Sequence, residues 1–113
     1  VAGLRDADGE PPLETAKREL AEEGQLRAAR WTKLFDLALS PGVSDEVLTL
    51  FLAADVAPAP VPDGFVAHDE ESSMTRDWVP LDDAVTAVLA GHVTNASFIA
   101  GILALQALRA RAT

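Results

Sequence analysis

The stretch Pro11–Gly24, PPLETAKRELAEEG, constrains the fold most, because it predicts one helix with a defined start and end. Prolines suit a first helical turn, where their missing N–H groups cost nothing, and Gly24 is a typical helix stop. One apolar stripe follows the i, i+3, i+7 pattern, at Leu13, Ala16 and Leu20. We therefore expect this helix to pack one face against the rest of the chain.

Three carboxylates, Glu19, Glu22 and Glu23, crowd the end of this helix. Spacings of three and four residues bring their Cβ atoms to about 5–6 Å, and each like-charge pair destabilises a bare helix by about 0.2–0.5 kcal/mol. The same gap lets two carboxylates share Mg²⁺, whose ligands lie at about 2.0–2.1 Å. Arg18, four residues after Glu14, is expected to be an internal counter-ion. Spacing alone fits a cation site and a solvated acidic face equally well.

Composition narrows the class of protein. The 113 residues suffice for one small domain, and the net charge of −9 argues against nucleic-acid and anionic-membrane partners while suiting cation binding. The absence of cysteine excludes disulfides and thiolate metal sites. The sequence shows neither a signal peptide nor an apolar run long enough to span a bilayer, so a cytoplasmic location is expected.

The remainder of the chain predicts a strand pair followed by helices. We expect a strand within 26–39, a turn-rich loop at 40–46, and a second strand over 47–56 that pairs with the first. Proline-rich and acidic loops should fill 57–74, and a short strand is expected over 74–81.

Two helices should end the chain, one over 81–89 with its stop at Gly91, and one that Thr94 or Asn95 caps and that runs to about Arg111. The last helix is expected to turn four apolar side chains inward, namely Phe98, Ile102, Leu105 and Leu108. Trp31 and Trp78 are expected in the core.

The stretch Gly3–Leu26, GLRDADGEPPLETAKRELAEEGQL, resembles the Nudix box, the loop–helix signature of Nudix hydrolases. That pattern is a glycine, a short loop, a glutamate, seven residues, and then Arg-Glu-apolar-x-Glu-Glu-x-Gly-apolar. The matching positions are Glu10, Arg18, Glu19, Leu20, Glu22, Glu23 and Leu26. Gln25 stands where the family has glycine. Either Gln25 takes a left-handed conformation, at about 1–2 kcal/mol, or Gly24 ends the helix one residue early.

Further stretches resemble the ADP-ribose pyrophosphatases of actinobacterial type within this family. They are SPGVSDE at 40–46, HDEESSM at 68–74, WVPLDDA at 78–84 and GHVTNASFIAGILAL at 91–105. The resemblance implies an α/β fold, the Nudix α/β/α sandwich around a mixed sheet. It also implies that residues 1–113 are the C-terminal part of a single Nudix domain beginning at the box, with the N-terminal strands missing and a homodimeric parent.

The resemblance implies metal-assisted hydrolysis of a small-molecule nucleoside diphosphate. Two or three Mg²⁺ or Mn²⁺ ions would bind Glu19, Glu22, Glu23 and the carbonyl of Ala2, with Arg18 among the catalytic groups. A carboxylate of the 70–71 loop would activate water. In the subfamily that this chain resembles, the base lies four residues before an apolar residue that re-enters a strand. Met74 matches that residue, which favours Glu70 over Glu71. Ser44 and Glu46 would contact substrate. For ADP-ribose the products would be AMP and ribose 5-phosphate.

Two other functions stay open. The chain could belong to a Nudix hydrolase of another nucleoside diphosphate derivative, such as a nucleotide sugar. It could also be an inactive fragment or a non-catalytic nucleotide-binding remnant, although a binding protein has no need of a general base at Glu70.

Overall fold

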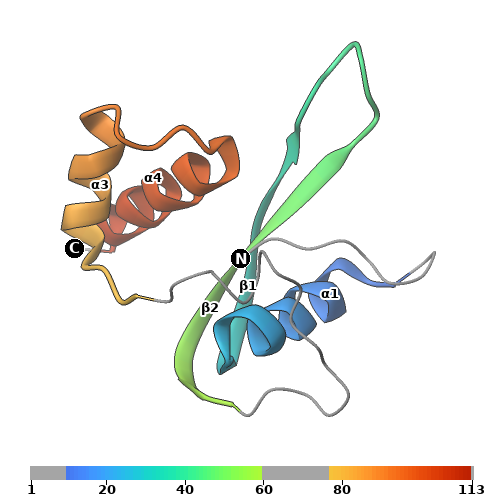
Figure 1. The fold of residues 1–113 in the computed structure, drawn as a ribbon, viewed down its shortest axis with the longest axis vertical. Coiled ribbons are helices and arrows are strands. Elements are labelled where there is room, and N and C mark those ends of the chain that lie inside the picture. The colour runs from blue at the N-terminus through green and yellow to red at the C-terminus, as the bar shows by residue number, and fades with distance from the viewer. Residues whose placement is uncertain (1–9, 60–76, 113) are drawn as a thin grey trace. The chain divides into compact units, whose positions relative to one another are not determined.

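The computed structural model of the protein describes residues 10–59 and 77–112 (Figure 1). The elements in this part are α1 (Pro12–Glu19), the π-helical turn η1 (Leu20–Gly24), β1 (Leu26–Ala38), β2 (Val47–Pro58), α3 (Leu81–Leu89) and α4 (Ala96–Arg111). They form two compact units. Among the described residues, the first unit holds 10–33 and 51–59 and the second holds 34–50 and 77–112. The mixed α/β character agrees with the fold class that the sequence predicts.

The expected first helix is present, and it begins where the prolines require. Pro11 has an extended backbone, with φ −61° and ψ 138°, and its carbonyl accepts from the N–H groups of Glu14 and Thr15. The last turn widens into η1. The expected apolar stripe is only half-buried, while the two buried side chains of this helix, Thr15 and Glu19, are polar. The least exposed face of this helix therefore carries polar side chains.

Gln25 ends this helix in the left-handed conformation, with φ 55° and ψ 39°, and its N–H donates to the carbonyl of Leu20. Of the two alternatives that the sequence left open, the first is therefore correct. Gly24 stays helical, and a Cβ there would lie 3.1 Å from Cδ1 of Leu20, so the Leu20 side chain would have to shift slightly for any other residue. The strain falls on Gln25 instead.

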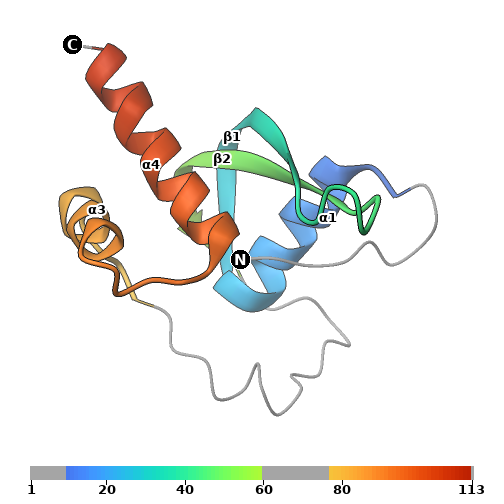
Figure 2. The same cartoon turned by 90° about the horizontal axis from the view of Figure 1, so that it is seen from above.

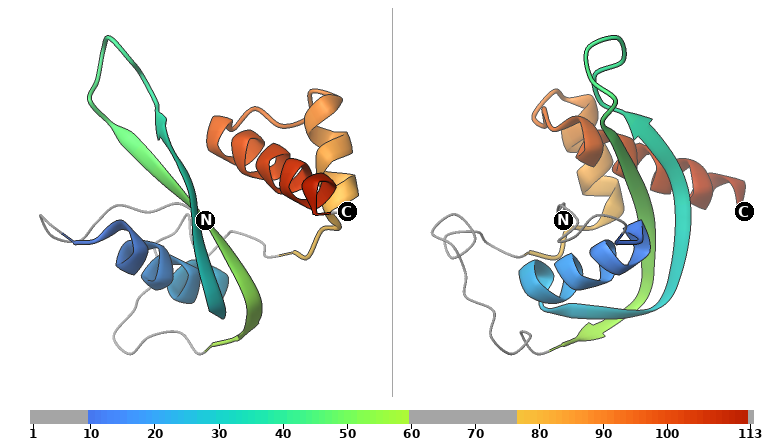
Figure 3. Two further views of the ribbon diagram at one scale, coloured as in Figure 1. Left: turned by 180° about the vertical axis from the view of Figure 1, so that it is seen from behind. Right: turned by 90° about the vertical axis from the view of Figure 1, so that its right-hand side faces the viewer.

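The two strands form the expected hairpin, and Figure 3 shows them running side by side along their length. The N–H of Leu39 donates to the carbonyl of Glu46 beside the connecting loop, and that of Ala59 donates to Gln25 at the far end. This pairing of early with late residues makes the strands antiparallel. In the first unit, the rings of Trp31 and Phe51 meet edge to face at 6.4 Å. This aromatic contact between β1 and β2 stabilises the pairing of the two strands.

A second left-handed residue, Asp55 with φ 56°, lies within β2. Such a residue inside a strand is typical of a β-bulge. The Asp55 carboxylate accepts a hydrogen bond from Nε of Arg30, at 2.6 Å, on the exposed side of the hairpin. Asparagine and aspartate tolerate this conformation better than glutamine does, so the strain at Asp55 is smaller than that at Gln25.

In the second unit, α3 and α4 pack against each other (Figure 2). An ion pair joins Arg109 of α4 to Asp82 of α3. Both helices have the expected bounds. Asn95 is the cap of α4, since its side chain accepts from the N–H of Phe98 at 2.9 Å. Gly91 follows α3 with φ 80°, as expected for a helix stop.

The strand expected over 74–81 is wrong for its described part, because residues 77–80 form no strand. Pro80 lacks the N–H that a strand donates, and it occupies the N-cap position of α3. Residues 74–76 lie outside the described part. Trp78 is 77% exposed, so the expectation that it lies in the core is also wrong.

The apolar side chains of the second unit are poorly covered. Of the four residues expected to face inward on α4, Ile102 and Leu105 are half-buried, whereas Phe98 and Leu108 are exposed. Among the described residues, Ala84 is the one buried apolar residue, and it is still 7% exposed. No helix of the described ranges 10–59 and 77–112 is long and apolar enough to cross a membrane.

The strain at Gln25 predicts that Gln25→Gly stabilises the protein. Relief of the left-handed conformation, about 1–2 kcal/mol, exceeds the extra backbone entropy of an unfolded glycine, about 0.5–1 kcal/mol. A net gain of about 0.5–1 kcal/mol in the free energy of unfolding is expected from urea denaturation of the full chain. Gln25→Ala is the matched control, because it keeps the Cβ that causes the strain. An equal gain in the alanine variant would contradict this explanation.

Candidate active site: the carboxylate helix around Arg18

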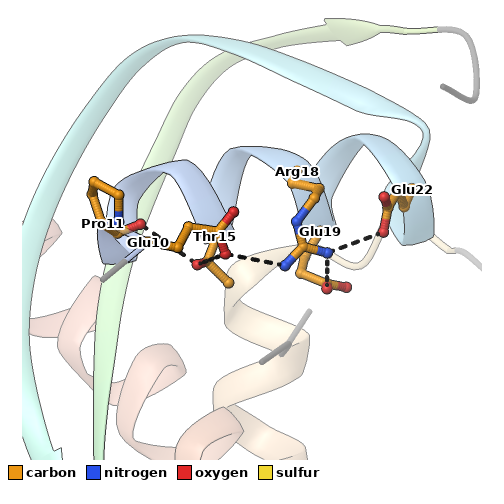
Figure 4. Close-up of polar contacts among 6 residues, drawn as sticks. All are labelled: Glu10, Pro11, Thr15, Arg18, Glu19 and Glu22. Atoms are coloured by element: carbon orange, nitrogen blue, oxygen red, sulfur yellow. Dashed lines mark hydrogen bonds and ion pairs between the residues drawn. The ribbon is translucent and has the colours of Figure 1, made fainter. Parts of the chain in front are cut away.

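The guanidinium of Arg18 lies among three carboxylates, those of Glu10, Glu19 and Glu22 (Figure 4). We call the segment Glu10–Gly24, which is this helix with the two residues before it, the carboxylate helix. Nη1 donates to Oε1 of Glu19 at 2.8 Å and to Oε2 of Glu22 at 3.4 Å. Nη2 donates to Oε1 of Glu10 at 3.4 Å. The side chains are 11–21% exposed, so these ion pairs are screened less than pairs at the surface.

The helical register explains these contacts. Glu22 lies one turn after Arg18, so the two side chains are neighbours on the helix surface. Glu10 precedes the helix, and the side chain of Glu10 extends along the helix toward the guanidinium. The expected pair of Glu14 with Arg18 is not the one that forms, because Glu14 faces Lys17, with Oε1 and Nζ 3.9 Å apart. Arg18 is therefore directed at Glu10, Glu19 and Glu22 rather than at the exposed Glu14.

Thr15 anchors the other side of Glu10. Its hydroxyl donates to Oε1 of Glu10 at 2.7 Å, and Thr15 is itself 7% exposed. Sequence analysis assigned no role to Thr15. The signal that could have found it is its spacing, because Thr15 lies exactly one turn before Glu19 and so shares its buried helix face.

Glu19 is a buried carboxylate whose pKa is raised above the ordinary 4.5. Burial is the largest cause, followed by a hydrogen bond with Glu23 and by repulsion from its charge, while Arg18 acts in the opposite direction. The guanidinium therefore offsets only part of the cost of holding this carboxylate charged. A further positive charge near Glu19 and Glu23 would relieve the remaining repulsion.

The donor set suits a hard divalent cation, because carboxylate oxygens are the ligands that Mg²⁺ and Mn²⁺ favour. Within residues 10–59 and 77–112, however, no three acidic or histidine side chains converge as a group ready to hold a metal ion. Glu19 and Glu22 are directed at Arg18 instead. Cation binding here would exchange contacts with Arg18 for contacts with the metal.

The remaining predicted site residues fall in two groups. Ser44 and Glu46 lie in the exposed loop between β1 and β2, where the N–H of Glu46 donates to Oγ of Ser44 at 3.0 Å. Their contact with substrate stays a prediction. Ala2, Glu70 and Glu71 lie outside the described residues.

The raised pKa of Glu19 predicts a pH-dependent effect of Glu19→Gln in metal-free protein. Because the folded state favours protonated Glu19, wild type loses stability relative to the variant as pH rises through the raised pKa. We expect equal free energies of unfolding below the ordinary pKa of 4.5, and a more stable variant at neutral pH. Urea denaturation in a chelator across pH measures both. A less stable variant at neutral pH would mean that the lost Arg18 contact outweighs the relieved repulsion.

Comparison with known proteins places these features in one family. The model of the NUDIX domain matches residues 1–101. An ADP-ribose pyrophosphatase of Mycobacterium tuberculosis is 45% identical over 107 residues, which are 95% of this chain and 50% of that protein. An ADP-ribose pyrophosphatase of Bacillus subtilis is 35% identical over 98 residues, 87% of this chain and 51% of that protein. The chain spans about half the length of these curated relatives. Because the family match covers most of its residues, the chain belongs to the NUDIX domain family.

Proposed function

We propose that the protein hydrolyses the diphosphate of ADP-ribose to AMP and ribose 5-phosphate, with Mg²⁺ or Mn²⁺ as the cofactor. The observation that carries the proposal is the carboxylate helix, in which Glu19 is buried, repelled by Glu23 and only partly neutralised by Arg18. A site short of positive charge suits a metal-bound diphosphate. The names of the two relatives support ADP-ribose as the substrate.

Glu19, Glu22 and Glu23, with the carbonyl of Ala2, would hold two or three divalent ions. When bound, these ions neutralise diphosphate oxygens and polarise the phosphorus under attack. Arg18 orients Glu19 and Glu22 in the absence of the metal, which keeps their oxygens on one side of the helix. Glu10 holds the opposite side of the guanidinium.

Glu70, or its neighbour Glu71, would orient the attacking water and accept its proton. The water oxygen forms a new bond to one phosphorus, and the bridging P–O bond breaks. The bridging oxygen leaves with the other phosphate, and one water is consumed for each AMP and ribose 5-phosphate. Ser44 and Glu46 would contact the substrate from the loop that follows β1.

The family resemblance also supports a homodimer acting in the cytoplasm on a small-molecule nucleotide. Because the net charge of −9 would repel a bare diphosphate, it suits a substrate that binds as a complex with divalent cations. Light scattering of the full chain tests the oligomeric state.

Glu23→Gln is expected to lower kcat/KM for ADP-ribose by at least about a hundredfold, because a metal contributes several kcal/mol to transition-state stabilisation. Release of AMP by the full chain with Mg²⁺ measures this effect. The matched control is Glu14→Gln, a glutamate of the same helix that pairs with Lys17 and lies outside the box positions. Its kcat/KM should stay within about twofold of wild type, as for an exposed side chain remote from the chemistry.

A panel of nucleoside diphosphate substrates completes that experiment. We expect AMP release from ADP-ribose to exceed turnover of nucleotide sugars. Preference for a nucleotide sugar would overturn the substrate assignment and keep the chemistry. Absence of turnover on every member, with Mg²⁺ and with Mn²⁺, would overturn the proposed function itself.

Glu70→Gln and Glu71→Gln separate the two candidates for the general base. Glu70→Gln is expected to lower kcat by about 10²–10⁴-fold with little change in KM, since a base acts in the transition state. Glu71→Gln should leave kcat nearly unchanged. The opposite pattern, measured in the same AMP-release assay, would move the base to Glu71.

A further inference from the structure

The hydroxyl of Thr15 is a buried donor that none of the proposed steps uses. Thr15 is 7% exposed, and its Oγ1 lies 2.7 Å from Oε1 of Glu10, a short distance typical of a hydrogen bond to a charged oxygen. The backbone carbonyl of Pro11 is a weaker second acceptor at 3.5 Å. The hydroxyl proton therefore belongs to the Glu10 contact.

This contact begins a chain of polar contacts that ends at the box carboxylates (Figure 4). The same Oε1 of Glu10 that accepts from Thr15 also accepts from Nη2 of Arg18, at 3.4 Å. The other nitrogen, Nη1, contacts Glu19 and Glu22. Thr15 thus fixes the oxygen that holds one side of the guanidinium, and the other side faces the carboxylates of the box.

We propose that Thr15 is a positioning residue for cation binding: its hydroxyl holds Glu10 against Arg18 and so limits how strongly Arg18 competes with a divalent cation for Glu19 and Glu22. The inference rests on the proposed function, because it takes Glu19 and Glu22 as cation ligands. Thr15 itself touches neither the cation nor the substrate.

The direction of the effect follows from the shared charge. Glu10 on one side and the pair Glu19 and Glu22 on the other compete for one guanidinium. Without the Thr15 hydroxyl, Glu10 loses one of the donors that orient it, the one at 2.7 Å, and its attraction for Nη2 weakens. Arg18 then pairs more strongly with Glu19 and Glu22, and a cation must displace a tighter partner. Removal of the hydroxyl should therefore weaken cation binding.

Isothermal titration of the full chain with Mg²⁺ alone tests the proposal. Thr15→Val, which keeps the branched shape and removes the donor, should raise the Kd for Mg²⁺ by about three- to tenfold, the range of one ordinary hydrogen bond. Thr15→Ser should stay within about twofold of wild type, because the hydroxyl is retained. In the double variant Thr15→Val with Glu10→Gln, the Kd should rise no further than in the stronger single variant, since both act through one contact.

Thr86→Val is the matched control. Thr86 also lies in a helix, but its hydroxyl donates to the backbone carbonyl of Asp82, at 3.0 Å, rather than to a carboxylate. Its Kd for Mg²⁺ should equal that of wild type. If Thr15→Val does not fold, Thr15→Ala replaces it, since this change removes the same donor with less bulk.

The outcomes separate the two proposals. A lower unfolding midpoint in Thr15→Val with an unchanged Kd would make Thr15 merely structural and overturn the inference. If wild type binds Mg²⁺ and releases AMP, and Thr15→Val has the same Kd for Mg²⁺, this inference is overturned and the proposed function is kept. Wild type that binds neither Mg²⁺ nor Mn²⁺ would overturn both.

Discussion

The interaction on which the first unit depends is the placement of one guanidinium among the carboxylates of its helix. Glu19 and Glu23 repel each other, and burial makes the charge of Glu19 costlier still. Arg18 offsets part of this cost, because its planar fork presents one nitrogen to Glu10 and another to Glu19 and Glu22. Lysine, a single point charge, could not hold carboxylates on two sides in this way. Arg18 therefore allows the helix to form although its carboxylates lie close together.

The backbone at both ends of the helix serves this arrangement. The extended conformation of Pro11 starts the helix directly after Glu10, which leaves the Glu10 side chain beside Thr15 and Arg18. At the other end, Gln25 takes a left-handed conformation so that β1 can begin at once, and its carbonyl accepts from Ala59 at the end of β2. The carboxylates are thus carried on a helix whose two ends are tied by backbone geometry and by the hairpin.

Local signals in the sequence predicted most of the elements and few of the contacts. Proline, glycine and asparagine act on their own neighbours, so the start at Pro11 and the cap at Asn95 could be recognised from the sequence. Burial depends on what covers a residue, and periodicity cannot supply that information. Hence the half-covered face of α4 was not foreseen. The absence of a strand over residues 77–80 has a different cause, because Pro80 is a local signal that the strand prediction did not weigh.

The candidate site divides along the same line. Family resemblance pointed to the carboxylates as candidate ligands, because they recur at fixed offsets, and this assignment stays a prediction. The helical spacing wrongly paired Arg18 with Glu14. Both Glu14 and Glu22 lie one turn from Arg18, but Glu14 is exposed and pairs with Lys17, whereas Glu22 is less exposed and pairs with Arg18. Thr15 went unnoticed for a related reason, since a threonine within a helix is usually unremarkable unless its neighbours are known.

The cation site proposed at Glu19 would weaken the metal-free fold. The burial that raises its pKa also removes water that would otherwise solvate the carboxylate. A poorly solvated, repelled carboxylate gains more from a cation than an exposed one such as Glu14, because less hydration is lost on binding. The cost of keeping Glu19 charged in the metal-free protein and its proposed role as a ligand would therefore have one physical origin. Under that proposal, the ion pairs of Arg18 would have to be strong enough to permit folding and weak enough for a cation to displace them.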